Sequence, residues 1–368
     1  MGFFCLSDST HGLLLFASLY ANLTAFDDIF LYLVRRDPAI CMSEYRSTIV
    51  CNSAAEAADL LKNGRLVAFP TETVYGLGAD ARNSDSVAGI FESKQRPTFD
   101  PLIVHVANES AARRLVTEFS PLAERLAAAF WPGPLTLVLP KRPEISDLVT
   151  SGLPGVGVRV PNHPVALELL RLADCPIAAP SANLFGRISP TTAQHVLDGL
   201  NGRIDGVLDG GACGVGVEST VLSLMTEQPT VLRPGGLPIE DIEAVIGPVL
   251  RASANSALDD AAQLAPGMLS RHYSPTTLLR LIEPDSFAIA MEGQKCGLMT
   301  YGPIHDNGNF SKVQQLSEFS DLKTCAANFF AALRSLDAAG LDVIIARRFP
   351  ETGLGIALND RLQRAACR

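Results

Sequence analysis

Residues 70–78 read PTETVYGLG and come directly after a short apolar stretch at 66–69. They are followed by KQRP at 94–97 and PLIVH at 101–105, and a second cluster, AAPSAN, occupies 178–183. Short apolar strands that end in small polar residues are typical of α/β sheets, in which ligands bind at the ends of the strands. The chain is therefore predicted to fold as an α/β protein whose two clusters form one site.

Four side chains in these clusters indicate what that site would bind. Arg96 offers a planar fork to phosphate oxygens and Lys94 a point charge, while Pro97 holds Arg96 in an extended or turn conformation. Ser181 and Asn183 add a hydroxyl and an amide just after the strand at 177–179. Together they predict a polyanionic ligand beside a small polar one. Taken alone, K-x-R also fits a solvated helix end, and S-x-N fits a turn or a helix cap.

Several common enzyme motifs are absent from the sequence. There is no G-x-x-x-x-G-K-[ST], so a Walker-type nucleotide site is excluded. The glycine run at 210–216 lacks the Rossmann spacing and is predicted to be a turn. Neither H-E-x-x-H nor a serine-hydrolase elbow occurs.

Composition narrows the class of protein further. The chain has 368 residues, of which 47% are hydrophobic and 19% charged, which allows two domains with cores of their own. A net charge of −9 argues against a general nucleic-acid binder. The eight cysteines never form a C-x-x-C pair, so zinc ribbons and dense disulfide frameworks are not expected and a reducing cytoplasm is.

The first residues look unlike the rest. Residues 13–26 are apolar, but no Lys or Arg precedes them, Asn22 and Thr24 interrupt them, and Asp27 and Asp28 close them. The run is shorter than the roughly 20 residues that a membrane span requires. We therefore expect neither a signal peptide nor an anchor, and no membrane association. Residues 1–44 are predicted to be a non-domain extension, with Met42 as the functional start.

From residue 45 onward, helical and strand patterns alternate. The expected helices are 54–62, 84–94, 122–130, 164–173, 191–197 and 239–246, and the expected strands are 66–69, 102–106, 135–139, 156–160, 177–179, 207–209, 220–224 and 231–233. This pattern predicts an α/β domain with a mixed sheet over 45–250.

A linker and a second unit follow this domain. Residues 251–275 are rich in Ala, Ser and Asp, and they are predicted to be a linker or lid. Residues 276–368 are predicted to be a small α/β domain, with strands at 278–282, 297–300 and 343–346 and helices at 322–336 and 356–366.

With these motifs in order, the chain resembles the Sua5/YrdC family of threonylcarbamoyl-AMP synthases in its long, two-domain form. The K-x-R signature stands at Lys94 and Arg96, and the S-x-N signature at Ser181 and Asn183. Further matches are WPGPLT (131–136), GVRVP (157–161), ESTV (218–221), LRPG (232–235), PGM (266–268), HYSP (272–275), ETGLG (351–355) and NDR (359–361). Residues 1–44 match nothing in the family.

The resemblance implies both a fold and a reaction. The fold is a YrdC-like twisted mixed sheet with helices around a concave cleft, plus a small Rossmann-like C-terminal α/β domain. The reaction joins L-threonine, bicarbonate or CO2, and ATP into L-threonylcarbamoyl-adenylate and pyrophosphate, with Mg2+ and no bound organic cofactor. Downstream proteins then transfer the group to adenosine 37 of tRNAs that read ANN codons, so tRNA itself would bind at most indirectly or weakly.

The resemblance also assigns residues. Catalysis would rest on Lys94, Arg96, Ser181 and Asn183; ATP would meet Arg96, Asp100, Ser181, Ser189, Arg233 and, as a lid, Tyr273; L-threonine would meet Thr73, His105, Arg159, the backbone of Ala179, and Ser219. Arg159 would pair with the threonine carboxylate. Glu72 either forms a salt bridge or helps to orient Mg2+, and the protein ligands of a metal stay unassigned.

Two departures and two alternatives accompany this interpretation. Gly155 stands where relatives often have a threonine near the nucleotide, and Leu269-Ser270 where many have Lys-Tyr, which predicts one lost contact and a weaker lid. The alternatives are an RNA- or tRNA-binding module and a carbamoyltransferase of the hydrogenase-maturation type. The second alternative would add paired C-x-x-C fingers and an acylphosphatase module, and this chain has neither.

Overall fold

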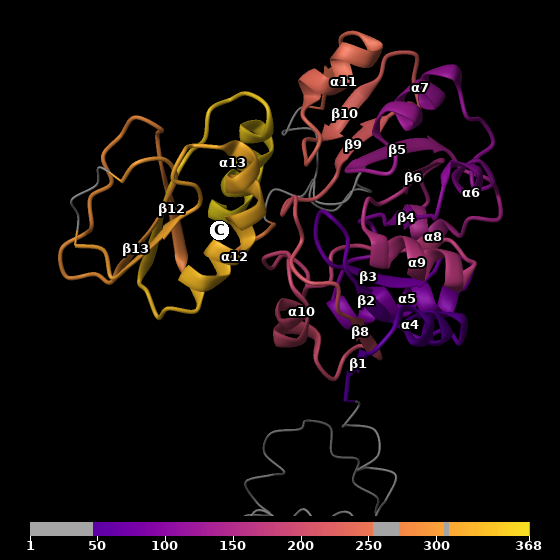
Figure 1. Ribbon diagram of the computed structural model, residues 1–368, viewed down its shortest axis with the longest axis horizontal. Helices are drawn as coiled ribbons and strands as arrows, with labels where there is room; N and C mark the ends of the chain where they lie inside the picture. Colours follow the sequence, from indigo (N-terminus) through magenta and orange to yellow (C-terminus); the bar gives the residue numbers. More distant parts are fainter. Residues whose placement is uncertain (1–46, 253–271, 305–308, 368) are drawn as a thin grey trace, which may run out of the picture. The chain divides into compact units, whose positions relative to one another are not determined.

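The computed structural model describes residues 47–252, 272–304 and 309–367, which hold two separate β-sheets (Figure 1). The larger sheet has eleven strands within these residues, in the order β1-β8-β2-β3-β7-β4-β6-β5-β9-β10-β11. They are β1 Ile49–Cys51, β2 Val67–Phe69, β3 Gly76–Asp80, β4 Ile103–His105, β5 Leu135–Pro140, β6 Gly155–Arg159, β7 Ile177–Ala178, β8 Gly206–Leu208, β9 Thr220–Ser223, β10 Thr230–Arg233 and β11 Leu250–Arg251. Parallel and antiparallel pairs alternate irregularly, which confirms the predicted mixed sheet.

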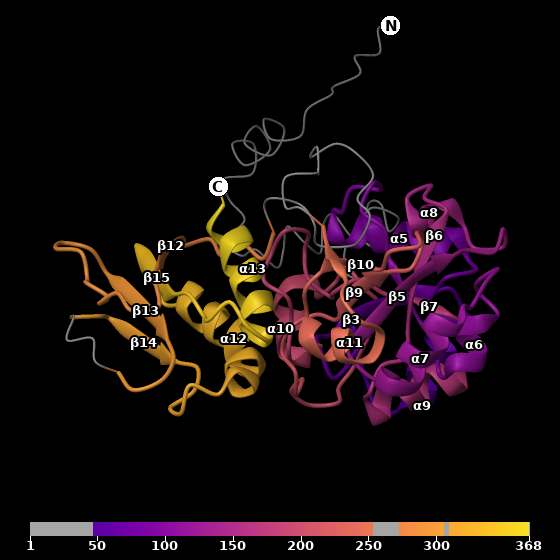
Figure 2. The same cartoon turned by 90° about the horizontal axis from the view of Figure 1, so that it is seen from above.

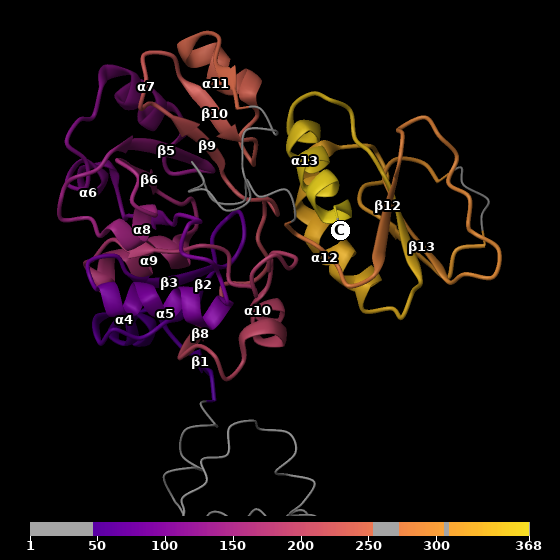
Figure 3. The ribbon, with the colours of Figure 1, turned by 180° about the vertical axis from the view of Figure 1, so that it is seen from behind.

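Helices cover both faces of this sheet. They are α4 Ala54–Lys62, α5 Ser84–Lys94, α6 Glu109–Arg113, α7 Pro121–Phe130, α8 Asp147–Thr150, α9 Pro164–Ala173, α10 Ala193–Leu200 and α11 Ile239–Ile246. Along β2 the side chains alternate, so that Val67 and Phe69 pack with α4 and α9, and Ala68 packs in the other core with α5, α7, α10 and α11. Figure 3 shows α7 and α11 side by side near β9 and β10.

The end of α5 explains where the two cations of the K-x-R signature lie. The helix begins at Asn83, whose side chain accepts hydrogen bonds from the backbone N–H groups of Asp85 and Ser86. It ends at Gln95, which adopts a left-handed conformation with φ of 53° and so turns the chain sharply. Lys94 is the last helical residue and is buried, and Arg96 follows the turn. The helix thus delivers both cations to the protein interior.

Strand β3 was not predicted from the sequence. It runs antiparallel to both β2 and β7, and Gly78 pairs with Val67. A Cβ atom on Gly78 would lie 2.8 Å from a methyl group of Ile177 and 2.9 Å from the ring of Phe69, so only glycine allows this approach. Glycine disfavours strands in general, and this motif therefore lacks the apolar alternation by which strands are recognised.

The smaller sheet is entirely parallel. Its strands are β12 Leu278–Ile282, β13 Cys296–Thr300, β14 Lys312–Gln315 and β15 Val343–Arg347, in the order β12-β15-β13-β14. Helices α12 Leu322–Asp337 and α13 Leu354–Ala366 lie between this sheet and the larger one (Figures 1 and 2). A parallel sheet with covering helices is the small Rossmann-like unit that was expected. We call residues 48–252 the large-sheet region and residues 278–367 the small-sheet region.

The two regions share a hydrophobic core. Phe329 and Phe330 of α12 are fully buried in a cluster that also contains Val74, Ile188 and Val217 of the large-sheet region. The backbones also approach closely there, because a Cβ atom on Gly216 would lie 2.2 Å from the carbonyl oxygen of Ala326. The small-sheet region is therefore packed directly against the segments that follow the first cluster and precede β9.

Most predicted elements agree with the structure within two residues. The bounds 54–62, 84–94, 164–173, 239–246 and 278–282 are reproduced, whereas the helix expected at 191–197 is α10 at 193–200. Short elements such as β14, α6 and α8 were not predicted. The calls on residues 1–44, on Met42, on PGM at 266–268 and on Leu269-Ser270 lie outside the described residues. Within the described part of the chain, no helix has both the length and the apolar character to cross a bilayer.

Candidate active site

The two sequence clusters meet through backbone hydrogen bonds. The N–H of Leu77 donates to the carbonyl oxygen of Pro180 at 2.8 Å, and the N–H of Ala182 donates to that of Tyr75 at 2.8 Å. Gly76 and Ser181 form an isolated antiparallel bridge between these bonds. The prediction that both clusters form one site is consistent with this pairing, which extends the β3 edge into the second cluster.

A pocket opens where the clusters meet. Nine predicted site residues line it: Thr73, Arg96, His105, Arg159, Ala179, Ser181, Ser219, Arg233 and Tyr273. Thr71, Val74, Ile103, Pro180, Glu218 and His272 complete the wall and had no predicted role. The cavity has a volume of about 40 Å³ and is partly open to solvent.

Lys94 lies behind this wall and holds the second cluster in place. Its Nζ donates to the carbonyl oxygens of Ser181 and Asn183, at 2.5 Å each, and the side chain is fully buried. No carboxylate forms an ion pair with it among the described residues, because Asp100 pairs with Arg96. Burial lowers the pKa of Lys94 well below its ordinary value and the charge of Arg96 lowers it further, although Asp100 opposes them.

Arg96 is held by the loop that follows it. Its guanidinium donates to the carbonyl oxygens of Asp100 and Pro101, and its Nη2 lies 2.9 Å from the Asp100 carboxylate. The ring of Phe185 lies 5.8 Å from the guanidinium. Asp100 thus acts on Arg96 rather than lining the pocket itself, and it stands behind the wall as Lys94 does.

Asn183 and Ser189 are the other predicted residues that do not line the pocket. The Nδ2 of Asn183 donates to the carbonyl oxygens of Leu184 and Arg187 and so closes the turn after the second cluster. Ser189 donates its hydroxyl to Oε1 of Glu218 at 2.6 Å. Oδ1 of Asn183 is buried and has no hydrogen-bond partner among the residues that the structure describes.

Arg159 ends β6 and reaches the pocket from the opposite side. Its Nη2 lies 2.7 Å from the Glu72 carboxylate, and its Nε donates to the carbonyl oxygen of Gly133 at 3.1 Å. Of the two roles left open for Glu72, the structure shows the salt bridge. Gly155 begins the same strand at its other end and does not line the pocket. A Cβ atom on Gly155 would lie 2.9 Å from both Val138 and Met225.

His105 ends β4 beside Arg159. It is buried, its ring meets that of Phe69 edge to face at 5.9 Å, and its Nδ1 has no hydrogen-bond partner within the described residues. Burial and then the charge of Arg159 lower the pKa of His105 to about 3, so the imidazole is neutral at physiological pH. A neutral ring can accept a hydrogen bond from a ligand, but it is too weakly basic to hold a proton.

Thr73, Ala179 and Ser219 supply smaller groups. The hydroxyl oxygens of Thr73 and Thr71 lie 2.8 Å apart, and those of Ser219 and Thr136 also lie 2.8 Å apart. The N–H of Ala179 donates to the carbonyl oxygen of Ile103, so a backbone contact from Ala179 to a ligand would use its carbonyl oxygen. All three predicted residues lie on the pocket wall.

Tyr273, predicted as a lid, is fully buried in the pocket wall. Its backbone φ of 60° is unusual for a residue other than glycine, and its ring packs 4.1 Å from that of His272 and 5.5 Å from that of Phe330. The hydroxyl has no hydrogen-bond partner among the described residues. The linker residue thus occupies the site in this structure.

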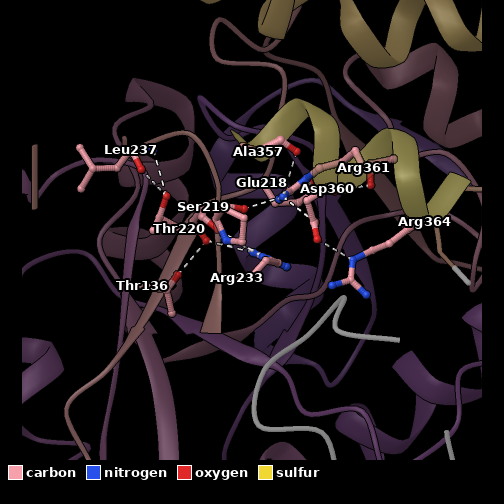
Figure 4. Close-up of polar contacts among 12 residues, drawn as sticks. Thr136, Glu218, Ser219, Thr220, Arg233, Leu237, Ala357, Asp360, Arg361 and Arg364 are labelled. Atoms are coloured by element: carbon pink, nitrogen blue, oxygen red, sulfur yellow. Dashed lines mark hydrogen bonds and ion pairs between the residues drawn. The ribbon is translucent and has the colours of Figure 1, made fainter. Parts of the chain in front are cut away.

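Glu218 is the site residue that the sequence analysis missed. Figure 4 shows its carboxylate beside Ser219 and Arg233 of the large-sheet region and next to Arg361, which comes from α13. Arg233 donates from Nη2 to the carbonyl oxygen of Ser219 at 2.9 Å. Glu218 lies within the quoted motif ESTV and Arg361 within NDR, so the signal was present, but nothing in the sequence indicates that the two motifs meet.

The described residues form no metal centre from side chains alone. Within the described ranges, no three His, Cys, Asp or Glu residues gather as metal ligands. Glu72, the carboxylate considered for that role, is paired with Arg159. The chemistry of the site is instead that of buried cations, small hydroxyls and unpartnered polar atoms around one cavity.

Comparison with known proteins gives consistent results for both regions. A family model described as telomere recombination, Sua5_yciO_yrdC, matches residues 59–235, and one described as threonylcarbamoyl-AMP synthase, C-terminal domain, matches residues 237–367. A Bacillus subtilis threonylcarbamoyl-AMP synthase is 46% identical over 85% of this chain and 92% of its own length. A Pyrococcus abyssi protein of the same name is 44% identical over 84% of this chain and 93% of its own.

The fold is shared with a solved relative. The crystal structure of Pyrococcus abyssi Sua5 in complex with L-threonine superposes with a TM-score of 0.78 at 42% sequence identity. The match covers 85% of this chain and 94% of that chain, so it includes both sheets.

Proposed function

The chain belongs to the Sua5 family of threonylcarbamoyl-AMP synthases, and from this premise we propose that it makes L-threonylcarbamoyl-adenylate at the pocket between its two sequence clusters. The observation that carries the proposal is the convergence of Arg96, Arg159 and Arg233 with the wall of Ser181 and Ser219 on one cavity. Three buried guanidinium groups around one cavity favour a ligand that brings several negatively charged oxygens.

We assign the phosphates of ATP to the end of the pocket that Lys94 and Arg96 support. Both cations stand next to Ser181, whose carbonyl oxygen Lys94 holds and whose side chain lines the wall. Arg233, which donates to Ser219, and Ser189, which donates to Glu218, would add contacts to the phosphates from a separate part of the site. These groups would bind the triphosphate and stabilise the charge that develops as pyrophosphate departs.

We assign L-threonine to the end formed by Arg159, His105, Thr73, Ala179 and Ser219. The carboxylate would share the guanidinium of Arg159 with Glu72. His105, held neutral by burial and by Arg159, would accept a hydrogen bond from the amino acid rather than take its proton. The solved relative that contains L-threonine supports this choice of ligand.

The reaction balances with the substrates alone. The threonine nitrogen bonds to the carbon of CO2, or of bicarbonate with release of water, and loses a proton to form a carbamate. A carbamate oxygen then bonds to the α-phosphorus of ATP while the bond from that phosphorus to the bridging oxygen of pyrophosphate breaks. Catalysis would rest on positioning and charge stabilisation, since burial lowers the pKa of both pocket imidazoles, His105 and His272, and makes them weak bases.

Mg2+ would bind chiefly through phosphate oxygens and water, as it commonly does with nucleotides. This agrees with the absence of a three-ligand cluster within the described residues and with the engagement of Glu72 by Arg159. The ion would neutralise charge on the departing pyrophosphate. The product would pass to separate transfer proteins that modify tRNA.

Residues 272 and 273 lie in the wall of the cavity, where Tyr273 is packed against His272 and Phe330. We therefore propose that Tyr273 swings out and then closes over the bound nucleotide, as lid residues do. We also keep 45–250 and 276–368 as the proposed domains, with a cytoplasmic location suggested by free Cys51, Cys175, Cys213, Cys296, Cys325 and Cys367.

The test is pyrophosphate release by the full chain, with the nucleotide product identified by mass spectrometry. We expect release and a threonylcarbamoyl-adenylate peak only when ATP, L-threonine and bicarbonate are all present. Release without threonine would indicate a different acceptor or an ATPase. Absence of the product from a protein that unfolds cooperatively would overturn the proposal.

A further inference from the structure

One arginine of the small-sheet region reaches into the wall of the proposed active site. Arg361 lies in the middle of α13 and its side chain is completely buried. Its Nε and Nη2 each donate to Oε2 of Glu218 at 3.1 Å, and its Nη1 donates to the carbonyl oxygen of Pro234 at 2.5 Å. Both partners belong to the large-sheet region, 143 and 127 positions away in sequence.

These two partners flank two residues of the pocket. Glu218 directly precedes Ser219, and Pro234 directly follows Arg233. Ser219 and Arg233 are themselves joined, because Arg233 donates to the carbonyl oxygen and to the hydroxyl of Ser219. Arg361 therefore bonds to the residue before Ser219 and to the residue after Arg233. Figure 4 shows Arg361 next to Glu218, with Ser219 and Arg233 beside them.

The contact continues to two further groups of the site. Oε1 of Glu218 accepts the hydroxyl of Ser189, so the oxygen that Arg361 leaves open orients a second predicted nucleotide contact. The guanidinium of Arg361 also lies 5.5 Å from the centre of the Tyr273 ring. The Arg361 side chain thus contacts Glu218 and Pro234, the residues next to Ser219 and Arg233, and Glu218 also binds Ser189. It lies beside the ring of Tyr273 as well.

We propose that Arg361 is a positioning residue of the synthase, through which the small-sheet region sets the geometry of Ser219, Arg233 and Ser189. It acts on the substrates only through these residues. The planar guanidinium is essential to this role, because it bridges Glu218 and Pro234 at once, whereas a lysine ammonium at the same place would reach only one of them. The inference rests on the proposed function, since it names what the small-sheet region contributes to that site.

The arrangement gives the small-sheet region a role at a pocket whose wall contains none of its own residues. Asp360 neighbours Arg361, lies 3.1 Å from its Nη1, and pairs in turn with Arg364 at 2.9 Å. These contacts within α13 hold the Arg361 guanidinium in the orientation in which it bonds to Glu218 and Pro234. Small displacements of catalytic groups reduce rates strongly, about 100-fold for a shift of about 1 Å, so the loss of this support is expected to reduce turnover.

The test uses the full chain and five variants: Arg361→Lys, Arg361→Met, Glu218→Gln, the double variant Arg361→Met/Glu218→Gln, and the matched control Arg348→Gln. Arg348 is also an arginine that contacts α13, but it does so within the small-sheet region, where its Nη2 donates to Gln363 at 2.6 Å. For each protein we would measure threonine-dependent pyrophosphate release, calorimetric binding of L-threonine, and the thermal unfolding midpoint.

We expect Arg361→Lys and Arg361→Met to lower kcat/KM for L-threonine at least about tenfold in protein that is still folded at the assay temperature. L-Threonine binding should weaken as well, because Ser219 is displaced, while Arg348→Gln keeps the kinetics and binding of the unmodified chain. The double variant Arg361→Met/Glu218→Gln should lose no more than Arg361→Met alone, because both changes remove the same contact.

Several outcomes would overturn the inference. Folded Arg361→Lys and Arg361→Met with kinetics within twofold of the unmodified chain would do so, as would fully additive losses in the double variant. Should both Arg361 variants fail to fold, Glu218→Gln decides: unchanged rates and threonine binding in that variant would exclude a positioning role. If the unmodified chain itself releases no pyrophosphate with threonine, the proposed function fails, and that result is distinct from the others.

Discussion

Lys94 and Arg361 are both fully buried cations at the same site, but their surroundings differ. Lys94 is bound by two carbonyl oxygens and by no carboxylate among the described residues. Arg361 is bound by the carboxylates of Glu218 and Asp360 and by one carbonyl oxygen. The comparison teaches that a buried cation with too little negative charge around it marks a place for an anionic ligand, whereas a neutralised one organises the protein.

The protonation equilibria follow the same division. Burial and Arg96 lower the pKa of Lys94, so its charge is unfavourable until an anion arrives. Burial acts against Arg361 as well, but Tyr273, Glu218 and Asp360 outweigh it and raise the pKa of that side chain. Burial would raise the pKa of Glu218, yet Arg361 and Arg233 hold it below its ordinary value. The charges of Glu218 and Arg361 therefore stabilise the fold, whereas the buried charge of Lys94 destabilises it.

The largest effect on stability is expected at Glu218. Glu218→Ala removes the carboxylate that bridges from the large-sheet region to buried Arg361 and should lower the free energy of unfolding by about 3–5 kcal/mol. Urea denaturation measures this, with Glu227→Ala at an exposed position as the control. A loss below about 1 kcal/mol would show that the Glu218 pair does not stabilise the fold.

The opposite result is expected at Lys94. Lys94→Met removes a buried charge that Asp100 offsets only in part, together with two hydrogen bonds to carbonyl oxygens. Because the cost of the buried charge should at least balance these bonds, stability should be unchanged or higher, while threonine-dependent pyrophosphate release falls about 100-fold. Denaturation and steady-state kinetics on the same preparation test both parts, and exposed Lys62→Met provides the matched control. A destabilised Lys94→Met protein, or one of nearly normal activity, would erase the distinction between the two ends.

Lowering the pH should reveal His105 as another buried group whose charged form is unfavourable, as it is for Lys94. The pKa of His105 is about 3 when folded and near 6.5 when unfolded, so only the unfolded state gains a proton between these values. Stability is therefore complete above pH 6.5 and falls with decreasing pH, by about 2 kcal/mol at pH 5 from this group. Burial also lowers the pKa of His272, which contributes with the same sign. His105→Gln should remove the His105 part of this loss in denaturation measured at pH 7 and pH 5; an unchanged pH dependence would contradict the shift.

The smallest effect on stability is expected at Tyr273. Its hydroxyl is buried without a hydrogen-bond partner among the described residues, so Tyr273→Phe should change the free energy of unfolding by less than about 0.5 kcal/mol. If the hydroxyl contacts the nucleotide in the closed site, KM for ATP should rise severalfold. A marked loss of stability would mean that the hydroxyl is already satisfied in the unliganded protein.

Local sequence patterns predicted the part of the site that contains Lys94 and Arg96 much better than the part that contains Glu218 and Arg361. Helix α5 and its cations could be predicted from a periodic apolar face and a following proline, all within residues 84–97. Strand β3 was missed because its glycines serve close backbone approach rather than strand propensity. Its partner Phe69 and the second cluster are distant in sequence, and their approach could not be read from the motif.

Sequence patterns did not predict contacts between residues that lie far apart in the chain. The Glu72–Arg159 salt bridge was one of two possibilities, and the structure decided between them. The Glu218–Arg361 contact joins residues 143 positions apart, in motifs that were recognised but assigned no joint role. Composition and spacing reveal which groups can do chemistry, but tertiary packing determines which of them neutralise each other.

The most direct measurement is calorimetric binding of a non-hydrolysable ATP analogue to the unmodified chain and to Lys94→Met and Arg361→Lys. If Lys94 is the incompletely neutralised cation that awaits phosphate, Lys94→Met should weaken analogue binding at least about tenfold while the protein stays fully folded. Arg361→Lys should weaken it less, since Arg361 touches no phosphate. Equal affinity of the unmodified chain and Lys94→Met for the analogue would contradict the assignment of this end of the pocket to ATP.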